Sequence, residues 1–146
     1  MLCTMGEKIM ITHGIALEAK KALITGVHQP GDDYRIALYS ASAKIGPTTK
    51  AYTTEGEIKG MGYTAGGVAL KGHRTGIIGK NAFITFDDVV LKSATFAAGG
   101  AMIYNASKGN AALCVLNLGA ERHVYDGAFE LKFPKPTETS ALILLA

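Results

Sequence analysis

The sequence predicts a mainly β fold: a single-domain β-sandwich, jelly-roll-like, with one N-terminal α-helix. Three observations support this prediction. The chain has 146 residues, the size of one domain built around one core. Its hydrophobic fraction of 48% and charged fraction of 18% are typical of a folded protein. Beyond residue 33, short runs rich in apolar residues are separated by Gly, Asn, Asp and Pro, which is the pattern of a sandwich or barrel.

The helix is predicted over residues 12–26. Apolar residues recur at helical spacing from Ile11 to Leu23, with charged residues between them. Thr12 is a suitable N-cap, and Gly26 can end the helix in a left-handed conformation. Residues 1–11 are expected to form an N-terminal arm, and residues 33–146 the β-sandwich.

The strand signals differ in how they distribute apolar residues. Tyr34–Tyr39 alternates as a strand with one drier face, and residues 129–133 predict a strand that is wet on one side. Residues 111–116 are apolar on both faces, so they predict a central strand covered on both sides, or a strand with one face against another chain. Four further strand segments are predicted, at residues 66–71, 82–91, 94–104 and 140–145.

Two segments are candidates for contact with other proteins. The first ten residues include three of the five methionines, a side chain that adapts to irregular apolar surfaces. Residues 46–62 are rich in Thr and Gly and predict a long, exposed, adaptable loop. The candidate interface residues are Met1, Met5, Ile9, Met10, Ile11, Thr48, Thr49, Tyr52, Thr53, Thr54, Met61 and Tyr63.

No catalytic or metal-binding motif is present in the sequence. The phosphate-loop, GxSxG and HExxH patterns are absent. Asp87 and Asp88 are adjacent within a strand-like run, so their side chains are expected to point to opposite faces. No two histidines have the spacing of a helical ligand pair. They are His13, His28, His73 and His123. We therefore expect neither an enzyme nor a bound metal or cofactor.

Charge, cysteine content and hydropathy argue against several further classes of protein. The net charge is +3, but the 15 Lys and Arg residues form no run, which argues against a nucleic-acid surface. Cys114 lies in an apolar run and is expected to be buried, whereas Cys3 is expected to be an exposed thiol. Two such cysteines form no disulfide framework. No apolar stretch approaches the roughly 20 residues that span a bilayer, and the N-terminus has no signal-peptide pattern.

Five segments resemble small structural proteins of tailed phages. They are residues 34–40 (YRIALYS), 51–58 (AYTTEGEI), 62–72 (GYTAGGVALKG), 101–110 (AMIYNASKGN) and 127–134 (GAFELKFP). The segments match in order and spacing, and the resemblance covers about residues 14–146.

This resemblance implies a virion protein, and most specifically a cement, or decoration, protein. Such a protein binds the outside of a shell of major capsid protein with the HK97 fold and stabilises it. The implied partners are the major capsid protein and further copies of the chain, as a homodimer or homotrimer, with neither nucleic acid nor membrane. A tail or head-completion component is the alternative within the same resemblance.

A carbohydrate-binding module, or an enzyme on a sandwich scaffold, is an alternative from a different class. Tyr52, Tyr63 and Tyr125 could form a sugar platform, although the chain has no Trp.

Overall fold

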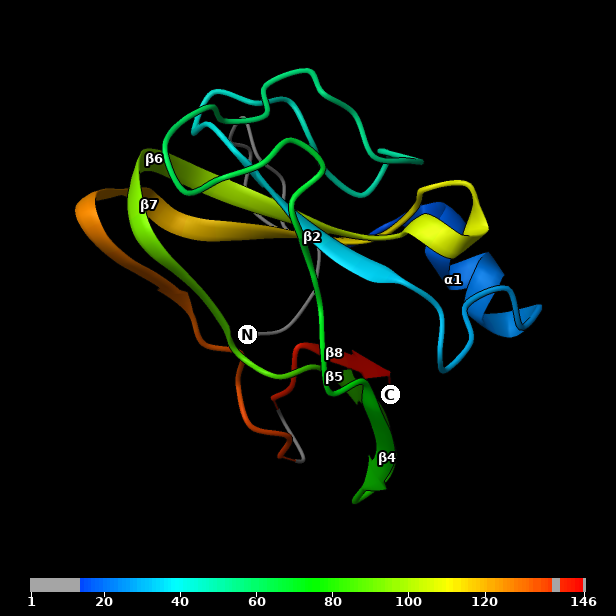
Figure 1. Ribbon diagram of the computed structural model, residues 1–146. Helices are drawn as coiled ribbons and strands as arrows, with labels where there is room; N and C mark the ends of the chain where they lie inside the picture. Colours follow the sequence, from blue (N-terminus) through cyan, green and yellow to red (C-terminus); the bar gives the residue numbers. More distant parts are fainter. Residues whose placement is uncertain (1–13, 138–139, 146) are drawn as a thin grey trace.

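The structure, a computed structural model, describes residues 14–137 and 140–145. It is mainly β, with two antiparallel sheets and one α-helix, which confirms the coarse fold prediction (Figure 1). The five-stranded sheet has the order β1 (Gly14–Ile15), β7 (Ala111–Leu131), β6 (Val89–Asn105), β2 (Tyr34–Tyr39) and β3 (Val68–Ala69). The three-stranded sheet has the order β4 (Arg74–Ile78), β5 (Asn81–Thr85) and β8 (Ile143–Leu145).

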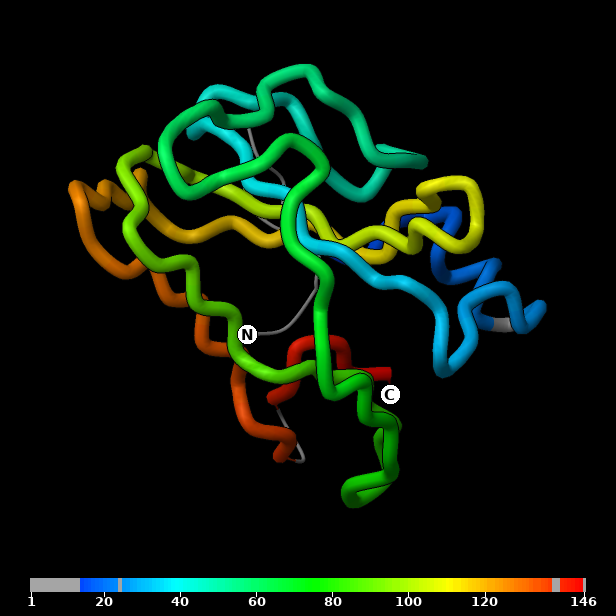
Figure 2. Tube along the Cα trace, viewed as in Figure 1, coloured from blue at the N-terminus to red at the C-terminus, as the bar shows by residue number. Residues whose placement is uncertain are grey.

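The β6–β7 ribbon dominates the molecule. Its two strands have 17 and 21 residues and are joined by a short 3₁₀ helix at Ala106–Lys108. Both strands bend together along their length (Figure 2). Ser93, with φ 52°, and Asp126, with φ 45°, lie where the register between the strands shifts. Such bulges let paired strands turn a corner, so one ribbon contributes to both sides of the core.

The core lies on the inner side of this bend. Phe96 of β6 and Phe129 of β7 are buried, with ring centroids 5.0 Å apart, and Tyr63 contacts Phe96 edge-on. Ile143 of β8 belongs to the same buried cluster as residues of the five-stranded sheet. In the described residues, the two sheets therefore share one continuous hydrophobic core.

The helix prediction was wrong at its N-terminus. The helix α1 spans Leu17–Ile24, and Gly14–Ile15 instead form β1, which pairs with Cys114 and Val115 of β7. Ala16 occupies the N-cap position without a side-chain hydrogen bond. The predicted cap, Thr12, lies outside the described residues.

The predicted helix end is confirmed. Gly26 has φ +75°, and its N–H donates to the carbonyl of Leu23. The N–H of Val27 donates to the carbonyl of Ala22. These two bonds form a Schellman motif, which needs a left-handed residue directly after the helix.

Most strand predictions are confirmed. β2 has the predicted bounds, but the expectation that one of its faces is wetter is wrong, because every residue of β2 is buried except the half-buried Arg35. Residues 111–116 of β7 are buried on both faces apart from a half-buried Ala111. At residues 129–131 of β7, Phe129 and Leu131 are buried while Glu130 is exposed. Cys114 is buried as expected, and Cys3 lies outside the described residues.

Several segments differ from the prediction. Of residues 66–71 and 140–145, only Val68–Ala69 and Ile143–Leu145 form strands. Residues 82–91 are not one strand, because Asp87 and Asp88 lie in the connection between β5 and β6. Residues 46–62 form a loop, but it is exposed only in part. Ile58 is buried, and a Cβ atom on Gly60 or Gly62 would overlap β6. The loop is closely packed on the sheet, so the expectation of a fully exposed, adaptable segment is wrong.

Candidate interaction surface

The predicted interface residues fall into two groups. Met1, Met5, Ile9, Met10 and Ile11 lie outside the described residues. The others lie in the loop that covers the five-stranded sheet (Figure 1). In this loop Thr48, Thr54 and Met61 are exposed, whereas Thr49, Tyr52, Thr53 and Tyr63 are half-buried.

A carboxylate holds the loop together. Glu57 Oε1 accepts a hydrogen bond from the Tyr52 hydroxyl at 2.6 Å, and Oε2 accepts from the Tyr63 hydroxyl and the Gly66 N–H. The Tyr63 hydroxyl also accepts from the N–H of Leu38 in β2. We call Tyr52, Glu57, Tyr63 and Gly66 the Glu57 clamp. It links three parts of the loop to each other and to the sheet.

The tyrosines of the clamp are held as neutral donors. Burial, followed by the hydrogen bond to Glu57, raises the pKa of Tyr52 to about 12. The same two causes raise the pKa of Tyr63. The Tyr52 ring stacks on Tyr104 at 4.8 Å. Both side chains thus serve to fix the loop. Of the three tyrosines considered as a sugar platform, only Tyr125 is exposed, at 87%.

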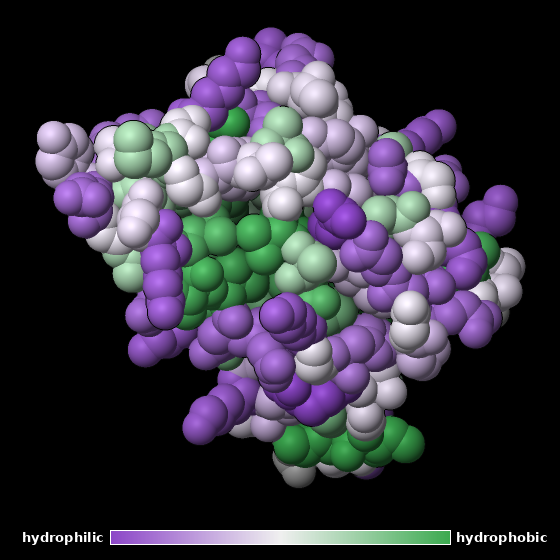
Figure 3. Space-filling view, viewed as in Figure 1, coloured by the Kyte–Doolittle hydropathy of each residue, from purple (hydrophilic) through white to green (hydrophobic). Residues whose placement is uncertain are grey.

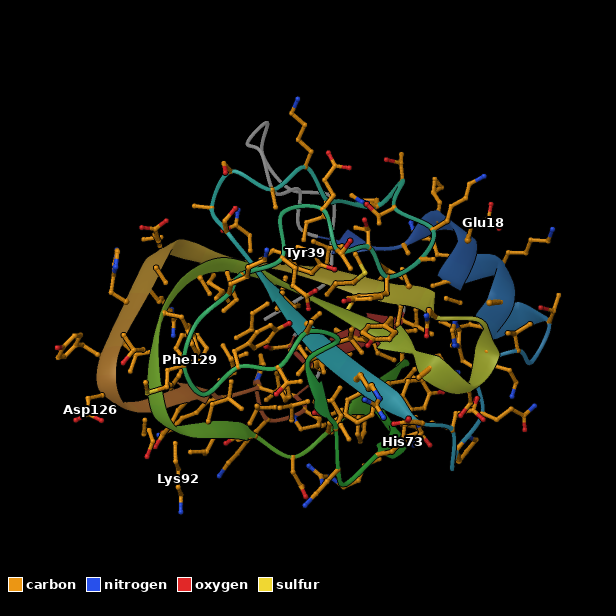
Figure 4. All side chains as sticks on the ribbon, turned by 45° about the horizontal axis from the view of Figure 1, so that its top comes forward. Glu18, Tyr39, His73, Lys92, Asp126 and Phe129 are labelled. Atoms are coloured by element: carbon orange, nitrogen blue, oxygen red, sulfur yellow. The ribbon has the colours of Figure 1, made fainter. Side chains whose placement is uncertain are left out.

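Beside the clamp, two large apolar side chains are exposed at the corner of the ribbon. Met61 is 68% exposed, and its carbonyl accepts from the Thr95 N–H at 2.9 Å. The Thr95 hydroxyl accepts a hydrogen bond from the N–H of Asp126, the residue that follows Tyr125. We call Met61, Tyr125 and Asp126 the corner surface. Figure 4 shows Asp126 on the outer side of the bend.

The inner side of the bend opens into an apolar hollow on the face shown in Figure 3. A pocket of about 270 Å³ lies between β3 and the start of β6. Val68, Val89 and Val90 supply its apolar lining, and Lys71, Asp87 and Asp88 its charged lining. Asp87 forms an ion pair with Arg74 at 2.6 Å, and Asp88 accepts from the Phe133 N–H. Both carboxylates therefore have structural partners.

A polar cluster lies at the opposite end of the ribbon. Asn105 is fully buried, and its amide NH₂ donates to Asp32 Oδ2 at 2.8 Å and to His28 Nδ1 at 3.1 Å. Its carbonyl oxygen accepts from the Ser107 N–H. Lys108 forms an ion pair with Asp32 at 3.1 Å. The cluster ties the segment after α1 to the tip of the β6–β7 hairpin.

Burial sets the direction of the pKa shift of His28, the histidine at the centre of this cluster. Desolvation lowers the pKa of His28, outweighing the nearby Asp32 carboxylate. Because Nδ1 accepts from Asn105, the neutral ring carries its proton on Nε2, and that atom is buried without a hydrogen-bond partner among the described residues. Desolvation also lowers the pKa of His73, which stacks on Tyr34 at 5.3 Å. The structure thus gives His28 and His73 packing roles.

The remaining chemistry-bearing residues do not converge. His123 is largely exposed and contacts Glu121, and His13 lies outside the described residues. Within residues 14–137 and 140–145, no three His, Cys, Asp or Glu side chains group as a metal site would require. No helix among these residues is long and apolar enough to cross a membrane.

Comparison with known proteins identifies no relative: no protein family, curated protein or solved structure matches the chain.

Proposed function

We propose that this chain is a structural protein of a tailed-phage virion: a cement protein that binds the outside of an HK97-fold shell and stabilises it. The observation that supports this best is the exposed apolar surface. Met61 and Tyr125 project from a rigid corner, and an apolar hollow opens on the inner side of the same bend. Large exposed apolar side chains near one another are typical of surfaces that contact other proteins.

The proposal includes the finer fold assignment, a sandwich of jelly-roll-like type. The five- and three-stranded sheets would be its two layers, since both contribute to one core. A scaffold of this kind presents loops at its rim and needs no reactive group to function.

The Glu57 clamp supports such a role. A surface that grips a shell loses less conformational entropy if its loop is ordered before binding. The clamp fixes the loop that carries Met61, so the corner surface is already formed in the free protein. Many weak contacts of this kind, repeated over a shell, give a large total stabilisation.

The proposal is tested by adding the purified protein to shells that lack it. We expect binding in stoichiometric amounts and a higher temperature of shell disruption. Met61→Asp should weaken binding, because it places a charge in a desolvated contact. Leu17→Asp, at an exposed apolar residue of α1, is the matched control and should bind normally. Absence of binding by the folded wild-type protein would refute the proposal.

A tail or head-completion position is the second candidate within the same class. The number of copies per particle separates the two, because a cement protein follows the many repeats of the shell, whereas a tail or neck component follows the low symmetry of a single vertex.

A further inference from the structure

The polar cluster at the tip of the β6–β7 hairpin holds the segment after α1 through one side-chain amide. The Asn105 NH₂ group donates to Asp32 Oδ2 at 2.8 Å and to His28 Nδ1 at 3.1 Å. Lys108 donates to both carboxylate oxygens of Asp32, at 3.1 and 3.2 Å. We call His28, Asp32, Asn105 and Lys108 the hairpin latch. It joins residues 28–32 to the hairpin tip.

The neighbours of Asn105 fix the orientation of its amide. The carbonyl oxygen accepts from the Ser107 N–H at 3.0 Å, while the NH₂ group faces the Asp32 carboxylate. Turning the amide over would place two donors together at Ser107 and two acceptors together at Asp32. The NH₂ group therefore faces the His28 ring, and Nδ1 of that ring serves only as an acceptor.

A second proton on the His28 ring is incompatible with this arrangement. The imidazolium donates from both nitrogens, so its Nδ1–H would face the NH₂ group of Asn105. Two donors at 3.1 Å form no hydrogen bond, and each loses its partner. Asp32 Oδ2 offers no replacement, because it already accepts three hydrogen bonds. Protonation of His28 therefore breaks the contact that closes the latch.

The surroundings of His28 act in the same direction. Burial of the ring opposes the proton most strongly, and this effect lowers the pKa of His28. The Asp32 carboxylate favours the proton, and the Lys108 ammonium opposes it. The other titratable or charged side chains that face the ring or line a pocket with it are Tyr34, Glu18 and Lys50. Glu18 and Lys50 carry opposite charges, so together they favour neither form of the ring.

We propose that the hairpin latch opens in mild acid: protonation of His28 releases residues 28–32 from the hairpin tip, while the sheet stays intact. Other bonds hold the sheet. The Ala106 N–H donates to the carbonyl of Asp33 at 2.8 Å, and β2 pairs with β6 over residues 34–39. These main-chain bonds involve no titrating group. The connection between α1 and β2 is therefore the part of the chain that acid frees.

The direction of the change follows from which state binds the proton better. The open latch leaves the His28 ring in water, where its pKa is near the ordinary value of 6.5, and the closed latch holds that pKa lower. Opening therefore becomes more favourable as the pH falls below 6.5. Asp32 stays ionised in this range, because hydrogen bonds from Asn105 and the Gln29 N–H hold its pKa below the ordinary value of 3.8. This inference concerns the free protein and does not depend on the proposed role in a virion.

The test follows hydrogen exchange by NMR between about pH 7.5 and about pH 5. The Asn105 side-chain NH₂ and the Ser107 N–H report on the latch, and the Ala106 N–H reports on the sheet. Protection is measured against an unstructured peptide at the same pH. We expect the protection of the two latch groups to fall by roughly fivefold or more across this range. The protection of Ala106 should stay constant.

His28→Gln is the matched variant. Its side-chain carbonyl can accept from the Asn105 NH₂ group as the neutral ring does, but it takes up no proton. The latch should therefore stay closed over the whole pH range. His73→Gln is the control, since burial also lowers the pKa of His73, which stacks on Tyr34. This variant should open as the wild type does.

Circular dichroism establishes that each variant is folded, and the wild type alone provides a further measurement. The ring signals of His28 should titrate with the same midpoint as the loss of protection, and a different midpoint would overturn the proposal. Constant protection of the latch groups in the wild type would overturn it, as would an equal loss at Ala106. Opening that persists in folded His28→Gln, or disappears in folded His73→Gln, would assign the change to another group and overturn it equally.

Discussion

At the scale of single residues, two polar groups hold several segments together: the half-buried Glu57 and the fully buried Asn105. Glu57 accepts three hydrogen bonds from residues of its own loop, and Asn105 bridges Asp32 and His28 at the far end of the ribbon. A buried polar group is costly without partners. Each group therefore stabilises one arrangement of the segments around it.

The clamp can be tested by replacing the carboxylate alone. Glu57→Gln keeps the shape but turns one acceptor into a donor that faces existing donors. We expect a loss of about 1–3 kcal/mol in the free energy of unfolding, measured with urea. Glu55→Gln changes an exposed carboxylate two residues earlier and should have no measurable effect. Equal stability of the two variants would contradict the inference that the Glu57 clamp stabilises the folded protein.

His28 predicts a loss of stability in mild acid. Its pKa in the folded protein lies below the reference value of 6.5, so the unfolded chain binds the proton first as the pH falls. The stabilisation that comes from burying the neutral His28 ring is complete above pH 6.5. It decreases as the pH falls towards the pKa of His28 in the folded state. His73 acts in the same direction.

The measurement is the free energy of unfolding at about pH 7.5 and about pH 5.5. We expect His28→Gln to reduce the difference between the two values, because the substituted side chain does not titrate. A difference unchanged in His28→Gln would show that this ring does not titrate as inferred.

At the scale of elements, the corner of the β6–β7 ribbon depends on unusual backbone conformations. Ser93 and Asp126 have positive φ without being glycine. A β-branched residue is strongly disfavoured there. The corner positions Met61 through Thr95, so its backbone shapes the corner surface.

Substitutions at Ser93 test the corner. Ser93→Gly should be neutral or stabilise the fold by up to about 1 kcal/mol, since it removes the strain of a left-handed residue. Ser93→Val should destabilise it by more than about 1 kcal/mol. Thermal unfolding measures both, and a Val variant as stable as the Gly variant would contradict the positive φ.

The elements also show what a sequence can predict. The end of α1 was predictable because Gly26 acts locally. Its beginning was not, because pairing with β7 draws Gly14 and Ile15 into a strand. β4 was missed, since Arg74–Ile78 has no alternation of apolar and polar residues. The Glu57 clamp joins residues far apart in the loop, and no local pattern marks it.

At the scale of the whole molecule, the proposed function assigns contact with the shell to two apolar features of the bent ribbon. The corner surface lies on the outer side of the bend, and the apolar hollow opens on its inner side. Under the proposed function, a chain with apolar features on both sides of one bend is suited to contact neighbouring shell subunits. Such linkage is what a cement protein contributes to stability.

The most direct measurement is the position of this chain in a map of the intact virion. We predict density for it on the outer face of the shell, repeated at equivalent capsid positions, with the corner surface against the major capsid protein. Density confined to the tail or neck, or a complete particle that lacks the chain, would contradict the proposed function.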